Sequence, residues 1–409
     1  MKGGILVLKK IIIAMMAVTA ISVVLILIMQ WDVKQGVKNY TRTHPMTETL
    51  SSKASIDVYN TGKSFYQNLF KDIESAEQYV WIHFFIIRDD EVSQEFFDVL
   101  TKKAQTGVDV RLSVDFLGSD IQKKSIKRLE KAGVKVTKSR PIQFKNIFYS
   151  LHHRNHRRLI SIDESIAYIG GFNMGDEYLG KDPKLGYWRD YHIRLAGDAG
   201  KEVYKQFKKD WTEDGGESIK SAPRPYTSAS SEGSVHFIFS TGDPLIERTI
   251  DWINEAETSV TITTPYFIPN NKLITALKDA VKRGVEVNIL VPDDTDAWFT
   301  KPVSYRIEKS LLEEGVKLYL YQKGFFHGKV MVVDHAWADV GTANWDPRSF
   351  YLNDESNCII RDEKVAKHLE SLIENDMKDS EKLTMEAFDE LPSWEKALQK
   401  TPPWLYYYF

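Results

Sequence analysis

The sequence predicts an α/β protein with two similar lobes related by a pseudo-twofold axis, preceded by an N-terminal transmembrane helix. One short motif occurs once in each half of the chain, and the strand and helix patterns around it recur in the same order. Strands that alternate with helices are typical of α/β layers with mostly parallel strands. A long apolar run near the N-terminus predicts the transmembrane helix.

The apolar run covers residues 11–29, which are nineteen residues without a charge. As a helix rising about 1.5 Å per residue, it comes close to the roughly 30 Å hydrocarbon core of a bilayer. A cleavable signal peptide is the alternative, but its apolar core usually has about 7–15 residues, and no small-x-small cleavage site follows Met29. We therefore expect an uncleaved single-pass anchor in a cell membrane. Lysines flank both ends, and they slightly favour an inside N-terminus with the lobes outside.

An internal repeat divides the rest of the chain. Thr61-Gly62 recurs as Thr241-Gly242, 180 positions later, and residues 75–82 recur at the same offset as residues 255–262. A stretch rich in Pro, Ser and Gly separates the halves, as expected of a linker. The predicted organisation is an anchor at 1–31, a linker at 32–52, lobe 1 at 53–221, an interlobe linker at 222–233, lobe 2 at 234–393 and an aromatic C-terminal tail at 394–409.

The repeated motif reads His-x-(Lys or Arg)-x4-Asp-x6-Gly-(Gly or Thr)-x-Asn. Its copies supply His156, Arg158, Asp163 and Asn173 in lobe 1, and His327, Lys329, Asp334 and Asn344 in lobe 2. A two-residue step on a strand points the histidine and the cation to one face, so both can address one phosphate. The small residues let the backbone turn closely, and the Asn amide can donate to an oxyanion or hold a histidine. Two lobes packed about a twofold axis would bring both histidines face to face in one shared site.

Longer blocks surround the motifs. They are 154–157, 170–178, 188–190, 265–269, 346–350 and 352–355. On these blocks the chain resembles the phospholipase D superfamily, and within it the bacterial cardiolipin synthases, over roughly residues 53–390. The resemblance implies that the lobes are phospholipase D-like α/β/α sandwiches. One position departs from the family pattern, because Arg158 stands where the family has Lys. Arginine is a planar fork that binds phosphate bidentately, so we expect an active enzyme with a changed rate.

The resemblance implies a mechanism with a phosphohistidine intermediate. Imidazole can attack phosphorus when neutral and donate a proton when charged, since its unperturbed pKa is about 6.5. We assign the nucleophile to His156 and the acid/base to His327, and the reverse assignment stays open. The groups expected to hold the phosphate are Arg158, Lys329, Asn173 and Asn344.

Three carboxylates complete the expected site. We group Asp163 and Asp334 with the catalytic residues, and expect them either to orient the opposite lobe's histidine or to brace the fold. Glu355 follows the second motif and would either fix an imidazole in one tautomer or be a surface carboxylate. No cofactor is implied. A metal site is not expected, because His156 already has a role and the lone Cys358 has no Cys-x-x-Cys partner.

For a cardiolipin synthase, the resemblance implies that a phosphatidyl group passes from one phosphatidylglycerol to another, giving cardiolipin and glycerol. The alternatives are a phospholipase D-type hydrolase, or a catalytically weak lipid-binding protein because of Arg158. The expected partners are these lipids and the bilayer. Nucleic acid is not expected, since the formal net charge is −3 and the pI about 6.4. The sequence leaves the oligomeric state open.

Two further segments could touch the membrane. Residues 142–149 mix aromatic and aliphatic side chains with Lys145, and would either dip into the lipid interface or pack on the core. The terminal residues 404–409 are rich in Tyr and Trp, whose rings partition to the head-group level, so this tail is either interfacial or a domain cap.

Overall fold

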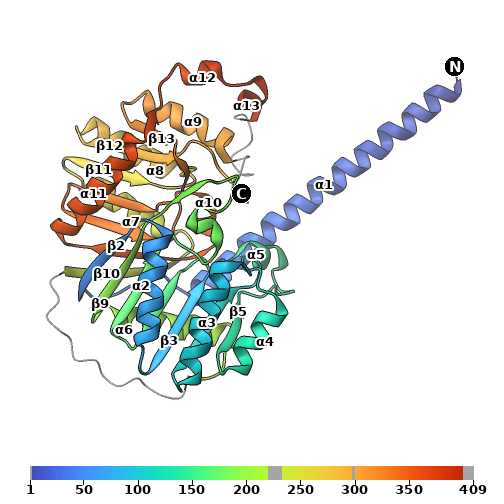
Figure 1. Cartoon of the computed structure of the whole chain (residues 1–409). Coiled ribbons are helices and arrows are strands. Elements are labelled where there is room, and N and C mark those ends of the chain that lie inside the picture. The colour runs from blue at the N-terminus through green and yellow to red at the C-terminus, as the bar shows by residue number, and fades with distance from the viewer. Residues whose placement is uncertain (1, 220–232, 297–299, 399–409) are drawn as a thin grey trace.

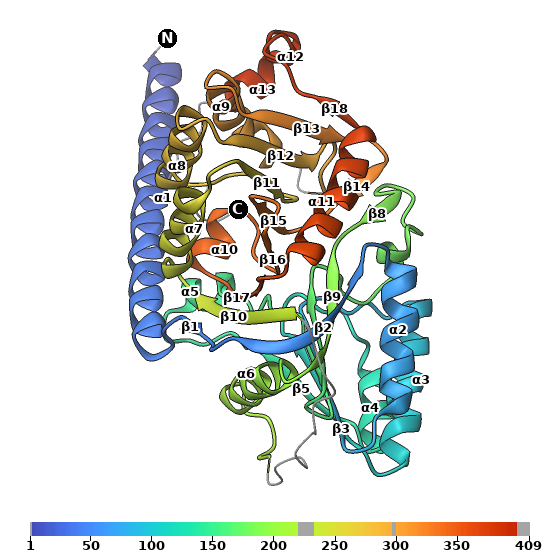
Figure 2. The same cartoon turned by 90° about the vertical axis from the view of Figure 1, so that its left-hand side faces the viewer.

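The computed structural model describes residues 2–219, 233–296 and 300–398. Residues 222–232 of the interlobe linker predicted at 222–233, and most of the aromatic tail, lie outside the described residues, whereas Gly233 begins a strand. Helix α1 (Lys2–Thr43) leads away from a body of two lobes, as Figures 1 and 2 show. A short strand β1 (Thr47–Glu48) connects α1 to lobe 1.

The two lobes contain the same series of elements. Lobe 1 comprises β2 (Ser52–Tyr59), α2 (Gly62–Ser75), β3 (Tyr79–Phe84), α3 (Glu91–Gln105), β4 (Asp109–Asp115), α4 (Lys123–Lys131), β5 (Lys135–Ser139), α5 (Ile147–His152), β6 (Leu159–Ile162), β7 (Ile166–Gly170), η1 (Asp176–Leu179), β8 (Tyr187–Arg189), β9 (His192–Gly197) and α6 (Gly200–Glu213). Lobe 2 comprises β10 (Gly233–Thr241), α7 (Pro244–Glu255), β11 (Ser259–Thr263), α8 (Asn271–Lys282), β12 (Glu286–Pro292), α9 (Thr300–Leu312), β13 (Lys317–Tyr321), β14 (Gly324–Phe326), β15 (Val330–Val333), β16 (Trp337–Gly341), α10 (Pro347–Tyr351), β17 (Asp354–Ile360), α11 (Glu363–Lys378), β18 (Ser380–Lys382), α12 (Ala387–Glu390) and α13 (Ser393–Leu398).

The strand order confirms two similar halves. Within the described residues sixteen strands form one sheet, in which β10 pairs with β2 at the centre. Outward from this pair, lobe 1 runs β2-β9-β7-β6-β3-β4-β5 and lobe 2 runs β10-β17-β16-β15-β11-β12-β13. The two series correspond strand for strand, so the motif strands β6 and β15 take equivalent places in their lobes.

The expectation of mostly parallel strands is wrong, because the sheet is mixed. Each lobe has a parallel trio, β3-β4-β5 or β11-β12-β13, and the other pairs of the large sheet are antiparallel. The physical reason lies in the motif itself, which folds as a hairpin. Its turns place Asp163 and Glu164, or Asp334 and His335, at φ between 51° and 56°, as type I′ turns require.

Amphipathic helices cover the faces of the sheet. In α2 the N-cap Thr61 accepts a hydrogen bond from the Ser64 amide at 3.2 Å, and Phe65, Leu69 and Ile73 recur every four residues on the buried face. Lobes 1 and 2 each enclose their own apolar core. A third core contains buried residues of both lobes, such as Ile193 from β9 and Val332 from β15. Apolar packing and the continuous sheet therefore hold the lobes as one body.

Helix α1 is long and apolar enough to cross a membrane, and its apolar window is not buried against the rest of the chain. The helix continues through residues 32–43, which is the first part of the segment expected to be a linker. There it packs on both lobes, because Val33 forms a small buried cluster with Tyr149 of lobe 1 and Leu352 of lobe 2. The Asp32 carboxylate also accepts a hydrogen bond from the Tyr149 amide at 3.1 Å. The end of α1 is thus fixed to the body.

Candidate active site

Residues of both motif copies line one cavity between the lobes, with a volume of about 420 Å³. The motif residues on its wall are His156, Arg158, Asn173, His327 and Asn344. Each histidine lies three residues before a motif strand, β6 or β15, and these strands are equivalent in the strand order. Symmetry of the fold therefore brings the two imidazoles to the same cavity.

Each imidazole is held at Nδ1 by a carboxylate of the opposite lobe. His156 Nδ1 lies 2.8 Å from Glu355 Oε2, and His327 Nδ1 lies 2.6 Å from Asp190 Oδ2. A carboxylate accepts the Nδ1 proton and so leaves a lone pair on Nε2 of the neutral ring. Within the described part of the chain, neither Nε2 makes a hydrogen bond. Both Nε2 atoms are thus available to a substrate.

The two carboxylates are themselves positioned by hydrogen bonds. Glu355 accepts from the Thr342 hydroxyl at 2.6 Å, and Asp190 accepts from the Tyr191 amide at 2.8 Å. Thr342 has a glycine as its counterpart in the first motif, and a Cβ at Gly171 would lie only 1.9 Å from Asp190 Oδ1. The second small position of the motif therefore serves a carboxylate in both copies: Thr342 donates a hydrogen bond, and Gly171 makes room.

The two motif cations are buried and point back to the histidines of their own copies. Arg158 is 1% exposed, and its guanidinium donates to the His156 carbonyl at 3.0 Å and to Asn173 Oδ1 at 3.1 Å. Lys329 Nζ donates to the His327 carbonyl at 2.7 Å, and burial lowers the pKa of this lysine to about 7. A buried guanidinium on the cavity wall and a buried ammonium beside it favour an anionic ligand.

The motif amides already have protein partners. Asn173 accepts from Arg158 and donates from Nδ2 to the Tyr178 hydroxyl at 3.1 Å. Asn344 Nδ2 donates to Asp346 at 3.1 Å, and its Oδ1 is buried without a hydrogen-bond partner among the described residues. Asn173 therefore fixes the guanidinium of lobe 1, which indicates an indirect part in holding a phosphate.

Burial controls the protonation of the site. Desolvation, with Arg158 and Lys329 nearby, lowers the pKa of both His156 and His327 well below the usual value. Burial also raises the pKa of Glu355 to about 7 and that of Asp190 to about 6. Without a ligand, the imidazoles are therefore neutral near pH 7, which is the form that can attack phosphorus.

Asp163 and Asp334 lie outside the cavity, which corrects their grouping with the catalytic residues. Asp163 accepts the backbone N–H groups of residues 77–79, at 2.7–2.9 Å, and Asp334 accepts those of residues 257–259, at 2.7–3.1 Å. These amides precede β3 and β11 in the neighbouring loop. Of the two roles expected for this pair, their contacts support bracing of the fold.

Asp190 is the functional residue that the sequence reasoning did not single out. It belongs to one of the blocks that carried the resemblance, but no role was assigned to it. Glu355 follows its motif Asn by 11 residues and Asp190 by 17, so the repeat spacing did not align the two carboxylates. The signal that would have found it is the symmetry itself, because a carboxylate for His156 requires a counterpart for His327.

Within the described ranges, no group of three or more His, Cys, Asp or Glu side chains is arranged to hold a metal ion. His153 and His156, which are close in the sequence, contact different carboxylates. His153 Nε2 lies 3.1 Å from Asp354, whereas His156 contacts Glu355.

A family model described as "Cardiolipin synthase, PLD-like domain" matches residues 69–211 and 249–377, most of both lobes. The chain belongs to the cardiolipin synthases. It is 39% identical over 348 residues to the major cardiolipin synthase of Bacillus subtilis (strain 168), covering 83% of this chain and 72% of that protein. It is 37% identical over 352 residues to a cardiolipin synthase of Clostridium perfringens (strain SM101 / Type A), covering 83% and 74%. The protein is therefore a phosphatidyltransferase of the phospholipase D superfamily.

Solved structures show the same fold. The phosphatidylserine synthase of Haemophilus influenzae Rd KW20 superposes with a TM-score of 0.69 at 15% identity, covering 88% of this chain and 98% of that one. The polyphosphate kinase of Porphyromonas gingivalis reaches a TM-score of 0.56 at 14% identity, covering 84% of this chain and 52% of that one. At these identities the likeness concerns the fold alone.

Proposed function

We propose that this cardiolipin synthase transfers the phosphatidyl group of one phosphatidylglycerol to a second one, through a phosphohistidine, and releases glycerol. One observation carries the proposal. Two imidazoles, each oriented at Nδ1 by a carboxylate of the opposite lobe, line one cavity that also contains a buried guanidinium and lies beside a buried ammonium. These are a nucleophile, an acid/base and charge stabilisation for one phosphorus centre.

In the first step, Nε2 of His156 attacks phosphorus and the bond to the glycerol oxygen breaks. His327 protonates the departing oxygen from its Nε2. In the free site burial lowers the pKa of His327, and Lys329 and Arg158 lower it further. The anionic phosphodiester offsets these two charges and so favours the imidazolium needed at this step. Asp190 stabilises that imidazolium through its contact with Nδ1.

In the second step, the 3′-hydroxyl of another phosphatidylglycerol loses its proton to His327 and attacks the phosphohistidine. The P–N bond breaks and His156 returns to its neutral form. The phosphohistidine conserves the energy of the original phosphodiester, so no nucleotide is needed. We assign the attack to His156 because burial, together with the nearby Arg158, Lys329 and Arg348, lowers the pKa of its imidazole and keeps the ring neutral.

Arg158 fits this scheme although the family pattern has Lys. Two of its nitrogens are fixed by the His156 carbonyl and by Asn173, so the guanidinium is preorganised. Among the described residues its remaining terminal nitrogen, Nη2, makes no hydrogen bond. It can therefore donate to a phosphate oxygen. This arrangement supports an active enzyme.

We also propose that α1 anchors the protein in the cell membrane as a single span. The support is the length and composition of the helix together with its direction away from the lobes. On this proposal residues 32–43 form a rigid helical stem between the membrane span and the lobes. The lobes are two domains of one catalytic body.

The test is an assay of the purified full chain with phosphatidylglycerol vesicles, with the products separated by mass spectrometry. We expect cardiolipin and glycerol in equal amounts, and none from His156→Ala or His327→Ala. Phosphatidic acid as the main product would instead show a hydrolase, and no product from a folded wild-type chain would show a lipid-binding protein. Full activity of His327→Ala would contradict the shared site.

A further inference from the structure

Exposed apolar side chains gather on one surface of lobe 1. Outside α1, nine large hydrophobic side chains are exposed among the described residues, and six of them lie in two short segments of this lobe. The six are Phe116, Leu117, Ile142, Phe144, Ile147 and Leu151, and we call their surface the lobe 1 patch. Phe144 is 98% exposed, whereas Tyr149 of the same segment is buried. The segment that was expected either to dip into lipid or to pack on the core therefore turns several of its apolar side chains outward.

The two segments form one surface because contacts tie them together. The Phe116 amide donates to the Ser139 carbonyl at 2.9 Å, shortly before the second segment begins. The Asp115 carboxylate accepts from the Leu117 amide at 3.0 Å and from Arg154 at 3.2 Å, so it joins the turn after β4 to the residues that follow α5. A cluster of exposed apolar side chains usually marks a site of interaction with a protein or a membrane.

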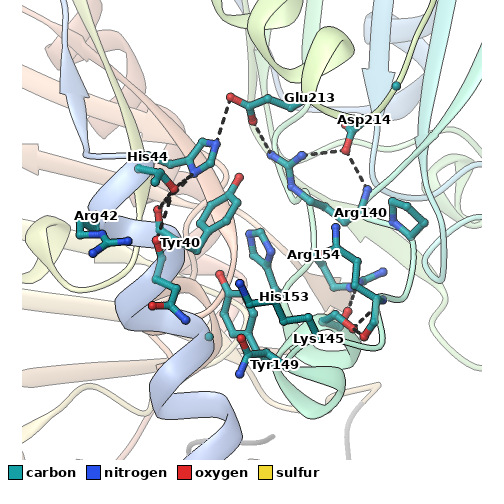
Figure 3. Close-up of a pocket in the computed structure, with 18 residues that line it drawn as sticks. Tyr40, Arg42, His44, Arg140, Lys145, Tyr149, His153, Arg154, Glu213 and Asp214 are labelled. Carbon is teal, nitrogen blue, oxygen red and sulfur yellow. Dashed lines mark hydrogen bonds and ion pairs between the residues drawn. The ribbon is translucent and has the colours of Figure 1, made fainter.

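The patch lies where α1 leaves its apolar run. Asn146 donates to the Asp32 carbonyl at 3.3 Å, and the Tyr149 amide donates to the Asp32 carboxylate at 3.1 Å. Ile147 lies between these two contacts in the chain, and Figure 3 shows Tyr149 lying against α1. Asp32 is three residues beyond Met29, where the apolar run ends, which is roughly 5 Å along the helix at about 1.5 Å per residue. In a chain whose α1 spans a bilayer, this part of the patch is thus at the depth of the lipid head groups.

The rim of the patch is cationic. Lys138 Nζ lies 5.5 Å from the centroid of the Phe116 ring, and Lys145 is exposed next to Phe144. Residues 141–154 contain no Asp or Glu. Aromatic and aliphatic side chains partition into the boundary of a bilayer, and lysines beside them are attracted to anionic head groups. The composition of the patch therefore matches an anionic lipid surface, and α1 brings such a surface to it.

The patch also adjoins the catalytic cavity. Gly118 follows Leu117, and a Cβ there would lie 2.6 Å from the carbonyl oxygen of Phe85, which lines the cavity. At the end of α5, the His152 carbonyl accepts a hydrogen bond at 3.4 Å from Arg348, which also lines the cavity. The apolar surface thus continues to the wall of the cavity of the histidines.

We propose that the lobe 1 patch inserts into the interface of the same bilayer that α1 spans, and so holds the body with its catalytic cavity next to the lipids. Phe144 enters furthest because it is the most exposed side chain of the patch, and Lys145 stays at the head groups. A phosphatidyl group keeps its acyl chains in the membrane, so this contact shortens the path of the substrate to the histidines. The proposal rests on α1 as the anchor and on the proposed function for a membrane lipid as the substrate.

Fluorescent labelling of the full chain tests the contact. Cys358 is the lone cysteine of the chain and is buried, so a maleimide label reacts selectively with a cysteine introduced on the surface. Phe144→Cys and the control Leu50→Cys are labelled with bimane and placed in nanodiscs that contain phosphatidylglycerol and a lipid with a nitroxide near the start of an acyl chain. Leu50 is 90% exposed but follows Thr43, which is roughly 20 Å past the apolar run along α1.

We expect the nitroxide to quench the label at position 144 and to leave the label at position 50 unchanged. Interfacial side chains lie roughly 5–10 Å into the boundary of head groups and acyl chains, so the fluorescence at position 144 should fall about twofold or more.

A pair of substitutions connects the contact with turnover. Ile142→Ser with Phe144→Ser should lower the rate of cardiolipin formation in nanodiscs about tenfold, because two apolar side chains no longer enter the interface. The same variant should keep the wild-type rate with a short-chain phosphatidylglycerol dissolved below its micelle concentration. Ile142→Leu with Phe144→Leu preserves the apolar surface and should keep both rates.

The remaining outcomes separate this contact from the other proposals. Equal quenching at positions 144 and 50, or a wild-type rate of Ile142→Ser/Phe144→Ser in nanodiscs, would overturn the contact. A label at position 144 that neither nitroxide lipid nor iodide in the water quenches would overturn it too, because protein, such as a second copy of the chain, would then cover the patch. Failure of the chain to enter nanodiscs would overturn the anchor as well. Quenching at position 144 without cardiolipin from the wild-type chain would support the contact and overturn the proposed function alone.

Discussion

Asp190→Asn removes the charge that orients His327 while it keeps the size of the side chain. Asp190 is fully buried, and its Oδ2 lies 2.6 Å from His327 Nδ1. The neutral amide no longer stabilises the imidazolium, and it can hold the ring in the wrong tautomer. Removing one charge from a buried hydrogen-bonded pair costs about 3–5 kcal/mol. At about 1.4 kcal/mol per tenfold, the rate of cardiolipin formation should fall by roughly 10²–10⁴.

The role of acid can be separated from a general loss of activity by the leaving group. In a phosphodiester with a nitrophenolate leaving group, that group departs as an anion without a proton. With this substrate the first-step rate of Asp190→Asn should therefore return most of the way to the wild-type rate. Glu355→Gln, the matched variant on the His156 side, should stay slow because its defect lies in the nucleophile. A fall of less than about tenfold for Asp190→Asn, or equal recovery of both variants, would refute the assigned roles.

Three further changes follow from the contacts. Gly171→Ala should reduce kcat at least as much as Asp190→Asn, because its Cβ would lie 1.9 Å from Asp190 Oδ1; normal turnover by a folded variant would contradict this crowding. Arg158→Lys should keep the same product and change the rate modestly, measured as kcat with phosphatidylglycerol vesicles, whereas loss of transfer to lipid would argue against a phosphate contact. Asp339→Asn should raise Tm at pH 8 and leave it nearly unchanged at pH 4. Burial raises the pKa of Asp339 to about 7. The ionised carboxylate therefore destabilises the fold increasingly as pH rises from about 4 to about 7, by about 2–4 kcal/mol at most. A Tm difference that is independent of pH would show that charge is not the cause.

Much of the fold could be predicted because the repeat supplies each pattern twice. The motif strands, α2 and the order of elements follow from apolar periodicity and from the offset of 180 positions. Strand direction could not be predicted in this way. A hairpin at Asp163 reverses the chain through two residues at positive φ, and alternation of strands and helices does not reveal that reversal. The continuation of α1 to Thr43 was not predicted. Polar residues follow the apolar run there, and the packing on α5 that suits them to a helix is a tertiary contact.

The site could be predicted where one residue performs its role within its own motif copy. The histidines and the two cations reach the cavity or its edge, although they lie just before β6 and β15 and not in these strands. Contacts that cross between lobes could not be derived from spacing. Glu355 was expected to hold an imidazole, but only the folded chain shows that this is His156 and that Asp190 does the same for His327. Asp163 and Asp334 bind backbone amides of a neighbouring loop, a contact that the motif spacing does not encode.

Counting phosphohistidine on the enzyme tests the shared site most directly. The full chain is mixed with phosphatidylglycerol, quenched in alkali, in which phosphohistidine survives, and digested for mass spectrometry. The account predicts at most one phosphatidyl-derived group per chain, bonded through phosphorus to His156, and none in the His156→Ala variant. Two groups per chain, or a group on each of the two histidines, would show two independent sites and would contradict the single site shared by the lobes.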